Sequence, residues 1–200
     1  MKRALYLGIV IAAATGGFVA GFLLGKKSKS VAHEPSGLVL AEYRAATFLM
    51  EGKLTEAEAA YHELAQHNQL SGGPYAGLAA CRMQMGDFVG ARELYEKALA
   101  RDPKSIDAMI GLGSAYGAQS DYTNAAAAYE RALSLSDQAA AAHWGLSKAD
   151  FYLGEYEVAR GHLERFKQLV PNSPRIADLE NLFAPRPQPD APPNAAPPHR

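Results

Sequence analysis

The sequence repeats itself every 34 residues between residues 38 and 173. Four columns keep similar residues in one register, and their members are Gly52, Gly86, Ser120 and Gly154; Leu54, Phe88, Tyr122 and Tyr156; Ala57, Ala91, Ala125 and Ala159; and Tyr61, Tyr95, Tyr129 and Leu163. A period of this length predicts a stack of helix–turn–helix units. Because such a stack presents an extended binding surface, we expect a binding protein rather than a catalyst.

The second unit, residues 72–105, shows the physical basis of the pattern. Gly86 and Asp87 separate two helical stretches, at a turn where a residue free to take positive φ is favourable. On the second stretch, apolar residues recur three, four and seven positions after Ala91, which places them on one helix face. We expect Ala91 to be small because the two helices approach closely there, and Tyr95 to fill the space beside it.

The third unit carries the fullest pattern, which consists of Leu112, Gly113, Tyr116, Ala125, Tyr129 and Ala132. This pattern resembles the tetratricopeptide repeat (TPR) family. The resemblance implies an all-α solenoid of about four helix–turn–helix repeats, at residues 38–71, 72–105, 106–139 and 140–173. The first repeat has Arg44 and Ala45 where the family has Leu-Gly, and we interpret it as an end repeat with one solvated face.

The N-terminal segment is of a different kind. Residues 4–25 contain no charge, and as a helix they would be about 33 Å long, enough to cross a bilayer core. Lys26, Lys27 and Lys29 follow the apolar run. We therefore predict a signal-anchor transmembrane helix over residues 1–25 and a basic linker over residues 26–37. A cleaved signal peptide is the alternative interpretation.

Small residues within this segment are spaced by four. Gly17, Gly21 and Gly25 form a continuous stripe, and such stripes allow membrane helices to pack backbone to backbone. The stripe favours a helix partner, either a second copy of the chain or another membrane protein. The alternative is that glycine is simply common in membrane helices.

The orientation of this predicted helix rests on a weak signal. Lysine and arginine are nearly balanced on its two sides, so the positive-inside rule barely discriminates. A short cationic N-terminus crosses the membrane against its potential, which favours an N-terminus inside the cell. The repeats are then periplasmic or otherwise extracytoplasmic, and the alternative is cytoplasmic.

The C-terminal end carries two further segments. Residues 174–183 place Ile176, Leu179, Leu182 and Phe183 on one apolar stripe, which predicts a helix that caps the solenoid. Residues 184–200 are rich in proline, and we expect a disordered tail of extended polyproline character. This tail is either a ligand for a proline-binding domain or a solvated terminus.

The composition and motifs offer little for catalysis. A formal net charge of −1 does not point to nucleic acid. Cys81 is the only cysteine, and we interpret it as a small core residue. His62 and His67 are five apart, a spacing that does not place both on one helix face for a metal. We therefore predict no cofactor, no metal site and no enzymatic activity.

The TPR resemblance also implies where a ligand binds. In that family the first helices of the repeats line a groove for an extended peptide or a helix. The groove positions carried onto this chain include Glu42, Met83, Gln84, Asp107, Ser114, Trp144, Lys148 and Tyr152. The family's chaperone-binding members hold a C-terminal carboxylate with Lys and Asn at these positions; because Lys148 is the only cation here and no Asn is present, we expect no such clamp.

Among the groove positions, Trp144, Lys148 and Tyr152 are the best candidate anchors for an apolar or helical segment. The alternative is that Trp144 and Tyr152 only pack against the next helix.

Three functions agree with these features. The first is a membrane-anchored scaffold or adaptor for protein partners in an envelope or membrane complex. The second is a structural accessory subunit held in a large membrane complex by its glycine-striped helix. The third is a chaperone-like holder of exported proteins.

Overall fold

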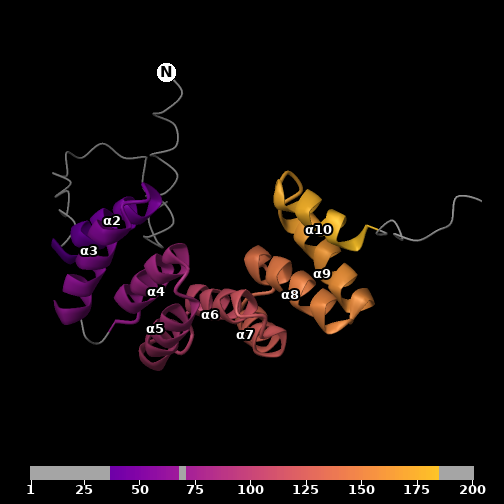
Figure 1. Ribbon diagram of the computed structural model, residues 1–200, viewed down its shortest axis with the longest axis horizontal. Coiled ribbons are helices and arrows are strands. Elements are labelled where there is room, and N and C mark those ends of the chain that lie inside the picture. The colour runs from indigo at the N-terminus through magenta and orange to yellow at the C-terminus, as the bar shows by residue number, and fades with distance from the viewer. Residues whose placement is uncertain (1–36, 68–70, 185–200) are drawn as a thin grey trace, which may run out of the picture. The chain divides into compact units, whose positions relative to one another are not determined.

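The computed structural model describes residues 37–67 and 71–184, and these residues form nine helices and no strand. The helices are α2 (Gly37–Met50), α3 (Leu54–His67), α4 (Gly73–Met85), α5 (Phe88–Arg101), α6 (Ile106–Ala118), α7 (Tyr122–Leu135), α8 (Ala140–Leu153), α9 (Tyr156–Leu169) and α10 (Arg175–Phe183), as Figure 1 shows. The prediction of an all-α helical solenoid is confirmed. The predicted membrane helix, most of the basic linker and the proline-rich tail lie outside the described residues. None of the helices in residues 37–67 and 71–184 is both long and apolar enough to cross a bilayer.

Consecutive helices pack against one another in pairs. The pairs α2–α3, α4–α5, α6–α7 and α8–α9 are the four repeats, and each second helix also packs on the first helix of the next repeat. The first helices α2, α4, α6 and α8 contact one another in sequence, whereas the second helices of neighbouring repeats do not. The first helices therefore lie closer together and share one face of the solenoid.

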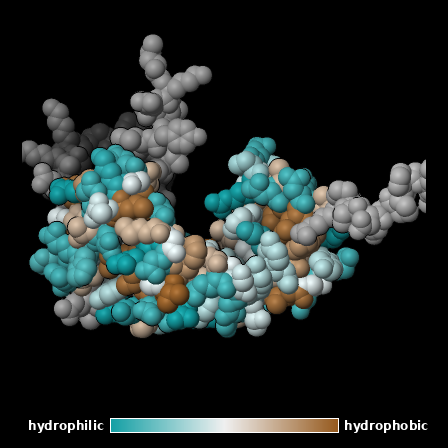
Figure 2. Space-filling model, in the orientation of Figure 1, coloured by the Kyte–Doolittle hydropathy of each residue, from teal (hydrophilic) through white to brown (hydrophobic). Residues whose placement is uncertain are grey.

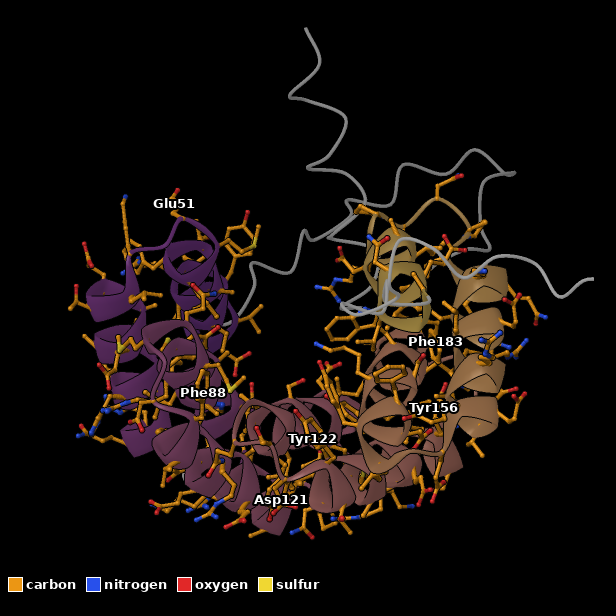
Figure 3. All side chains as sticks on the ribbon, turned by 45° about the vertical axis from the view of Figure 1, so that its right-hand side comes forward. Glu51, Phe88, Asp121, Tyr122, Tyr156 and Phe183 are labelled. Atoms are coloured by element: carbon orange, nitrogen blue, oxygen red, sulfur yellow. The ribbon has the colours of Figure 1, made fainter. Side chains whose placement is uncertain are left out.

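The turns within the repeats follow from the first column of the sequence pattern. Gly52, Gly86 and Gly154 have φ angles of 74°, 80° and 86°, in the left-handed region that favours glycine. Ser120 occupies the same place in the third repeat with φ of 62°. Directly after it, the side chain of Asp121 accepts a hydrogen bond from the backbone N–H of Asn124 and caps α7; Figure 3 shows Asp121 and Tyr122 at the start of this helix.

Each junction between repeats places an aromatic ring against a glycine. A Cβ added to Gly111 would lie 2.2 Å from the ring of Tyr95, and one added to Gly145 would lie 2.3 Å from the ring of Tyr129. Gly77 faces Tyr61 in the same way. The three glycines are also 34 residues apart, so they form a fifth column that the sequence analysis missed although the period reveals it.

The C-terminal helix α10 covers the end of the last repeat. It packs on α8 and α9, and Leu179 is buried there with Leu163 and Phe166. Leu163 stands in the tyrosine column and Leu179 in the glycine column, so two leucines replace the ring-on-glycine contact at this junction.

The N-terminal end of the solenoid has one exposed face, and that face carries apolar as well as polar side chains. Arg44 is exposed, but so are Leu40 and Tyr43, at 52% and 56%. In each later repeat, the residues at the positions equivalent to Leu40 and Tyr43 pack against the preceding repeat. No repeat precedes α2 among the described residues, so nothing described covers them.

Candidate functional site

A cavity of about 340 Å³ opens between the first helices α4, α6 and α8 and the side of α7. Its lining is mostly apolar and aromatic, and consists of Met83, Ser114, Gly117, Ala118, Tyr122, Ala125, Tyr129, Trp144, Gly145, Lys148, Ala149 and Tyr152. Lys148 is the only ionisable lining residue other than the tyrosines, and no carboxylate lines the cavity. The cavity therefore suits a ligand with an apolar group and one anionic or polar group beside it.

Three repeats contribute the predicted groove residues that meet here. The cavity brings together Met83 from α4, Ser114 from α6, and Trp144, Lys148 and Tyr152 from α8. Glu42 on α2, Gln84 on α4 and Asp107 on α6 are not among its lining residues. The spacing of the repeats predicted the shared face, but it did not indicate which of its positions enclose a cavity.

Trp144 has two environments. The residue lines the cavity, and its side chain also packs on the buried cluster of Leu163, Phe166 and Leu179. Lys148 Nζ lies 4.7 Å from the ring centroid, and Arg175 Cζ at the start of α10 lies 5.0 Å from it, both within cation–π range. The two interpretations of Trp144, anchor and core residue, are thus not exclusive in this geometry.

Tyr152 forms part of an aromatic rim. Its ring stacks on Tyr122, with centroids 4.5 Å apart and planes 16° from parallel, and Phe151 meets it edge-on. Tyr152 remains 48% exposed, so this stack leaves much of the side chain available to a ligand. The rim continues from Phe151 to Tyr156 and Phe183; Figure 3 shows Tyr156 and Phe183 in the same C-terminal part of the described residues.

Two hydroxyl groups in the lining of the cavity are hydrogen-bonded to each other. Ser114 Oγ donates to the carbonyl oxygen of Ile110 at 2.9 Å, and the Tyr129 hydroxyl lies 3.1 Å from Ser114 Oγ. Because the hydroxyl hydrogen of Ser114 is already used, Tyr129 is the donor of this second bond. Burial raises the pKa of Tyr129, so its hydroxyl keeps its proton. Both hydroxyls therefore offer only acceptor lone pairs to a ligand, and no histidine or carboxylate lines the cavity to activate Ser114 as a nucleophile.

A buried titratable cluster lies between α8 and α9. His143 Nε2 donates to the carbonyl oxygen of Asp137 at 3.1 Å, which leaves its Nδ1 to accept from His162 Nδ1 at 3.0 Å. His162 Nε2 then faces Asp150 Oδ2 at 3.7 Å. Burial lowers the pKa of both histidines, so His162 is neutral at neutral pH and supplies no positive charge to Asp150.

Burial, together with the carboxylates of Glu155 and Glu130, raises the pKa of Asp150 to about 6. The sequence analysis did not identify this cluster. The signal it could have used is the seven-residue spacing of His143 and Asp150, which places both on one face of α8. No group of three His, Cys, Asp or Glu residues within residues 37–67 and 71–184 has the arrangement of a metal site.

The surface of the described residues is a mosaic of hydrophilic and hydrophobic patches, without one continuous apolar band on the face that Figure 2 presents.

Cys81 is fully buried in the cluster with Tyr61 and Leu78, and burial raises the pKa of its thiol.

Comparisons with known proteins agree with this architecture. Two tetratricopeptide repeat models match residues 74–138 and 110–174, which together span half of the chain. No curated protein matches the sequence.

Several solved structures share the fold at low sequence identity. The structure of pilF from Pseudomonas aeruginosa has a TM-score of 0.67 and 19% identity, with 73% of this chain and 67% of that chain covered. The TPR protein TTC0263 from Thermus thermophilus has a TM-score of 0.66 and 15% identity, with 75% and 83% covered.

The first TPR domain of Spaghetti (RPAP3), bound to the HSP90 peptide SRMEEVD, has a TM-score of 0.52 and 22% identity, with 55% of this chain and 87% of that chain covered. The repeated columns, the paired helices and the matching family models lead to one conclusion: this chain belongs to the tetratricopeptide repeat family.

Proposed function

We propose that the chain is a membrane-anchored scaffold that holds an apolar segment of a protein partner in the cavity beside α8. The observation that carries this proposal is the convergence of Met83, Ser114 and Trp144, from three successive repeats, on one cavity with an aromatic rim. The lining has neither a base for a nucleophile nor a metal ligand set, so its chemistry is that of binding. A related TPR domain binds a peptide, which supports a protein segment as the ligand.

The membrane part of the proposal rests on residues 1–25 and on the lysines of residues 26–37. An anchored repeat domain keeps its partner close to the bilayer, which is useful for an adaptor in an envelope or membrane complex. In this proposal the repeats are extracytoplasmic, and a cytoplasmic location is the alternative.

The experiment that tests the scaffold is affinity purification of the full-length protein from membranes in mild detergent, followed by quantitative mass spectrometry. The test variant is Ala118→Trp, which fills the cavity from the exposed end of α6. The matched control is Ala127→Trp on the exposed face of α7, outside the cavity lining. We expect partners to be lost from the first variant and kept by the second.

The outcome also separates the other functions. An unchanged set of integral membrane proteins at near-integer ratio from both variants contradicts the groove and indicates an accessory subunit held by its membrane helix. Suppressed aggregation of unrelated unfolded proteins, lost with Ala118→Trp, indicates a chaperone-like holder. Recovery of the protein in the soluble fraction after alkaline extraction of membranes contradicts the anchor.

A further inference from the structure

Two cations lie near the ring of Trp144, Lys148 from the cavity lining and the exposed Arg175 from outside it, and neither side chain has an acceptor among the described residues. Lys148 Nζ and Arg175 Cζ lie 4.7 Å and 5.0 Å from the ring centroid, and neither side chain forms an ion pair or hydrogen bond within residues 37–67 and 71–184. The indole Nε1 of Trp144 is buried and has no hydrogen-bond partner there. A buried donor without an acceptor is costly, so this corner is incomplete in polar terms.

The charges at this corner are of one sign. Both cations lie about 5 Å from the same ring centroid, so they are within about 10 Å of each other, a distance over which like charges still repel. Arg175 is also the first residue of α10; its backbone N–H donates to Ser173 Oγ, and Asp178 is the acidic residue of the first turn. An anion at this place is attracted by both cations and offsets the repulsion between them.

The rest of the cavity does not offer an anion a better place. The hydroxyls of Ser114 and Tyr129 have no hydrogen left to donate, and apart from Lys148 and the neutral hydroxyls of Tyr122 and Tyr152 the remaining lining is apolar or aromatic. A ligand that matches the whole site therefore combines one negative charge, near Trp144, with an apolar group toward Met83 and Tyr152.

We propose that the partner segment places the carboxylate of an internal Asp or Glu side chain at the corner formed by Trp144, Lys148 and Arg175, with a bulky apolar side chain next to it in the cavity. This inference rests on the proposed function and adds the chemistry of the ligand. A neutral amide does not offset two cations, whereas a carboxylate does and also accepts several hydrogen bonds. No asparagine lines the cavity to hold a chain-terminal carboxylate in the manner of the chaperone-binding relatives, so the carboxylate belongs to a side chain.

The test is a selection from random 12-residue peptides displayed within a phage coat protein, so that no peptide has a free C-terminus. The target is the full-length protein in mild detergent, as the wild type and as the variants Lys148→Glu and Lys104→Glu. Lys104 is an exposed cation before α6 and outside the cavity, so it controls for the change in net charge. Thermal unfolding of each variant checks that the fold is intact.

We expect wild type and Lys104→Glu to enrich peptides with an Asp or Glu beside an aromatic or long aliphatic residue, and Lys148→Glu to lose the preference for acid. For one enriched peptide, replacing its Glu with Gln should weaken binding to the wild type roughly tenfold.

Four outcomes overturn the inference. Enriched peptides without an acidic residue, or an acidic preference that survives Lys148→Glu, contradict the inference and leave the groove in place. A separate library with free C-termini that alone gives binders identifies a terminal carboxylate and contradicts the side-chain assignment. No enrichment from either library contradicts the proposed function itself, and the inference with it.

Discussion

At the scale of the residue, the junction between repeats depends on glycines that face aromatic rings. Tyr95, whose ring covers Gly111, is only 7% exposed, and this burial raises its pKa to about 12. The ring leaves no room for a Cβ on that glycine. Sterics, not backbone conformation, require glycine here, because Gly111 lies within the regular helix α6.

We predict that Gly111→Ala lowers the free energy of unfolding by about 1–3 kcal/mol, because the new methyl group overpacks the junction. The matched control is Gly161→Ala in α9, where an added Cβ meets nothing within 4 Å. This control should stabilise by up to about 1 kcal/mol through helix propensity. Urea unfolding measures both, and equal effects of the two variants contradict the steric explanation.

A second residue-scale prediction concerns the turn of the third repeat. Ser120 has φ of 62°, where a residue with a Cβ is strained, whereas the other three turns have glycine. Ser120→Gly should raise the free energy of unfolding by up to about 1 kcal/mol, since relief of strain exceeds the entropy that glycine adds to the unfolded chain. The reciprocal change Gly154→Ser should lower it by a similar amount. Thermal unfolding tests the pair, and the same sign for both changes excludes the strain argument.

At the scale of the element, the α8–α9 pair contains the buried Asp150 cluster, whose effect depends on pH. The pKa of Asp150 is about 6 in the folded protein and 3.8 as its ordinary value, so between these values the folded state holds a proton that the unfolded state has released. The contribution of Asp150 to stability is therefore present below about pH 4 and is lost as the pH rises through 6. The lowered pKa values of His143 and His162 act in the opposite direction, because the unfolded state binds their protons first as the pH falls through about 6.5.

We predict that Asp150→Asn leaves stability almost unchanged at pH 4 and raises it at pH 7 by roughly 1–3 kcal/mol, since it removes a buried charge that only the ionised wild type carries. Melting temperatures of both proteins between pH 4 and pH 8 measure the difference. A difference that does not vary with pH shows that Asp150 acts through packing alone. As a control for position, Asp178→Asn on the exposed part of α10 should give no such pH dependence.

At the scale of the whole molecule, the described helices contact only helices that are one or two elements away in the chain. The helix α10 contacts α8 and α9, and no contact links it to α4 or α5 in the part of the chain described here. In a stack of this kind, stability is close to a sum of repeat and interface contributions, so local damage has a local effect.

We predict that Leu179→Ala, which empties a position only 1% exposed in α10, lowers the protection of α8 and α9 amides against hydrogen exchange by about 2–4 kcal/mol of opening free energy. Protection in α4 and α5 should stay within experimental error. Hydrogen exchange with mass spectrometry measures both regions in one experiment. An equal loss of protection in α4 and α5 contradicts this prediction and shows that the solenoid opens as one cooperative unit.

The sequence by itself determined the repeat and its helix pairs, whereas the predicted groove positions follow from the resemblance to the TPR family. The repeat and its helix pairs depend on local rules: a 34-residue period, a residue suited to positive φ at each turn, and small residues such as Ala91 and Ala125 where paired helices approach. Because every repeat obeys the same rules, the position of Trp144 on a first helix follows from its number alone.

Tertiary structure alone decided which side chains from different elements lie near one another. Arg175 is 31 residues from Trp144 and belongs to no repeat column, yet the return of α10 onto α8 brings it to the same ring as Lys148. Likewise, only the packing of α9 on α8 places His162 beside His143 and buries Asp150. A sequence period specifies which side chains share a helix face. The distances between side chains of different helices are set only when those helices pack, and so is the burial that shifts a pKa.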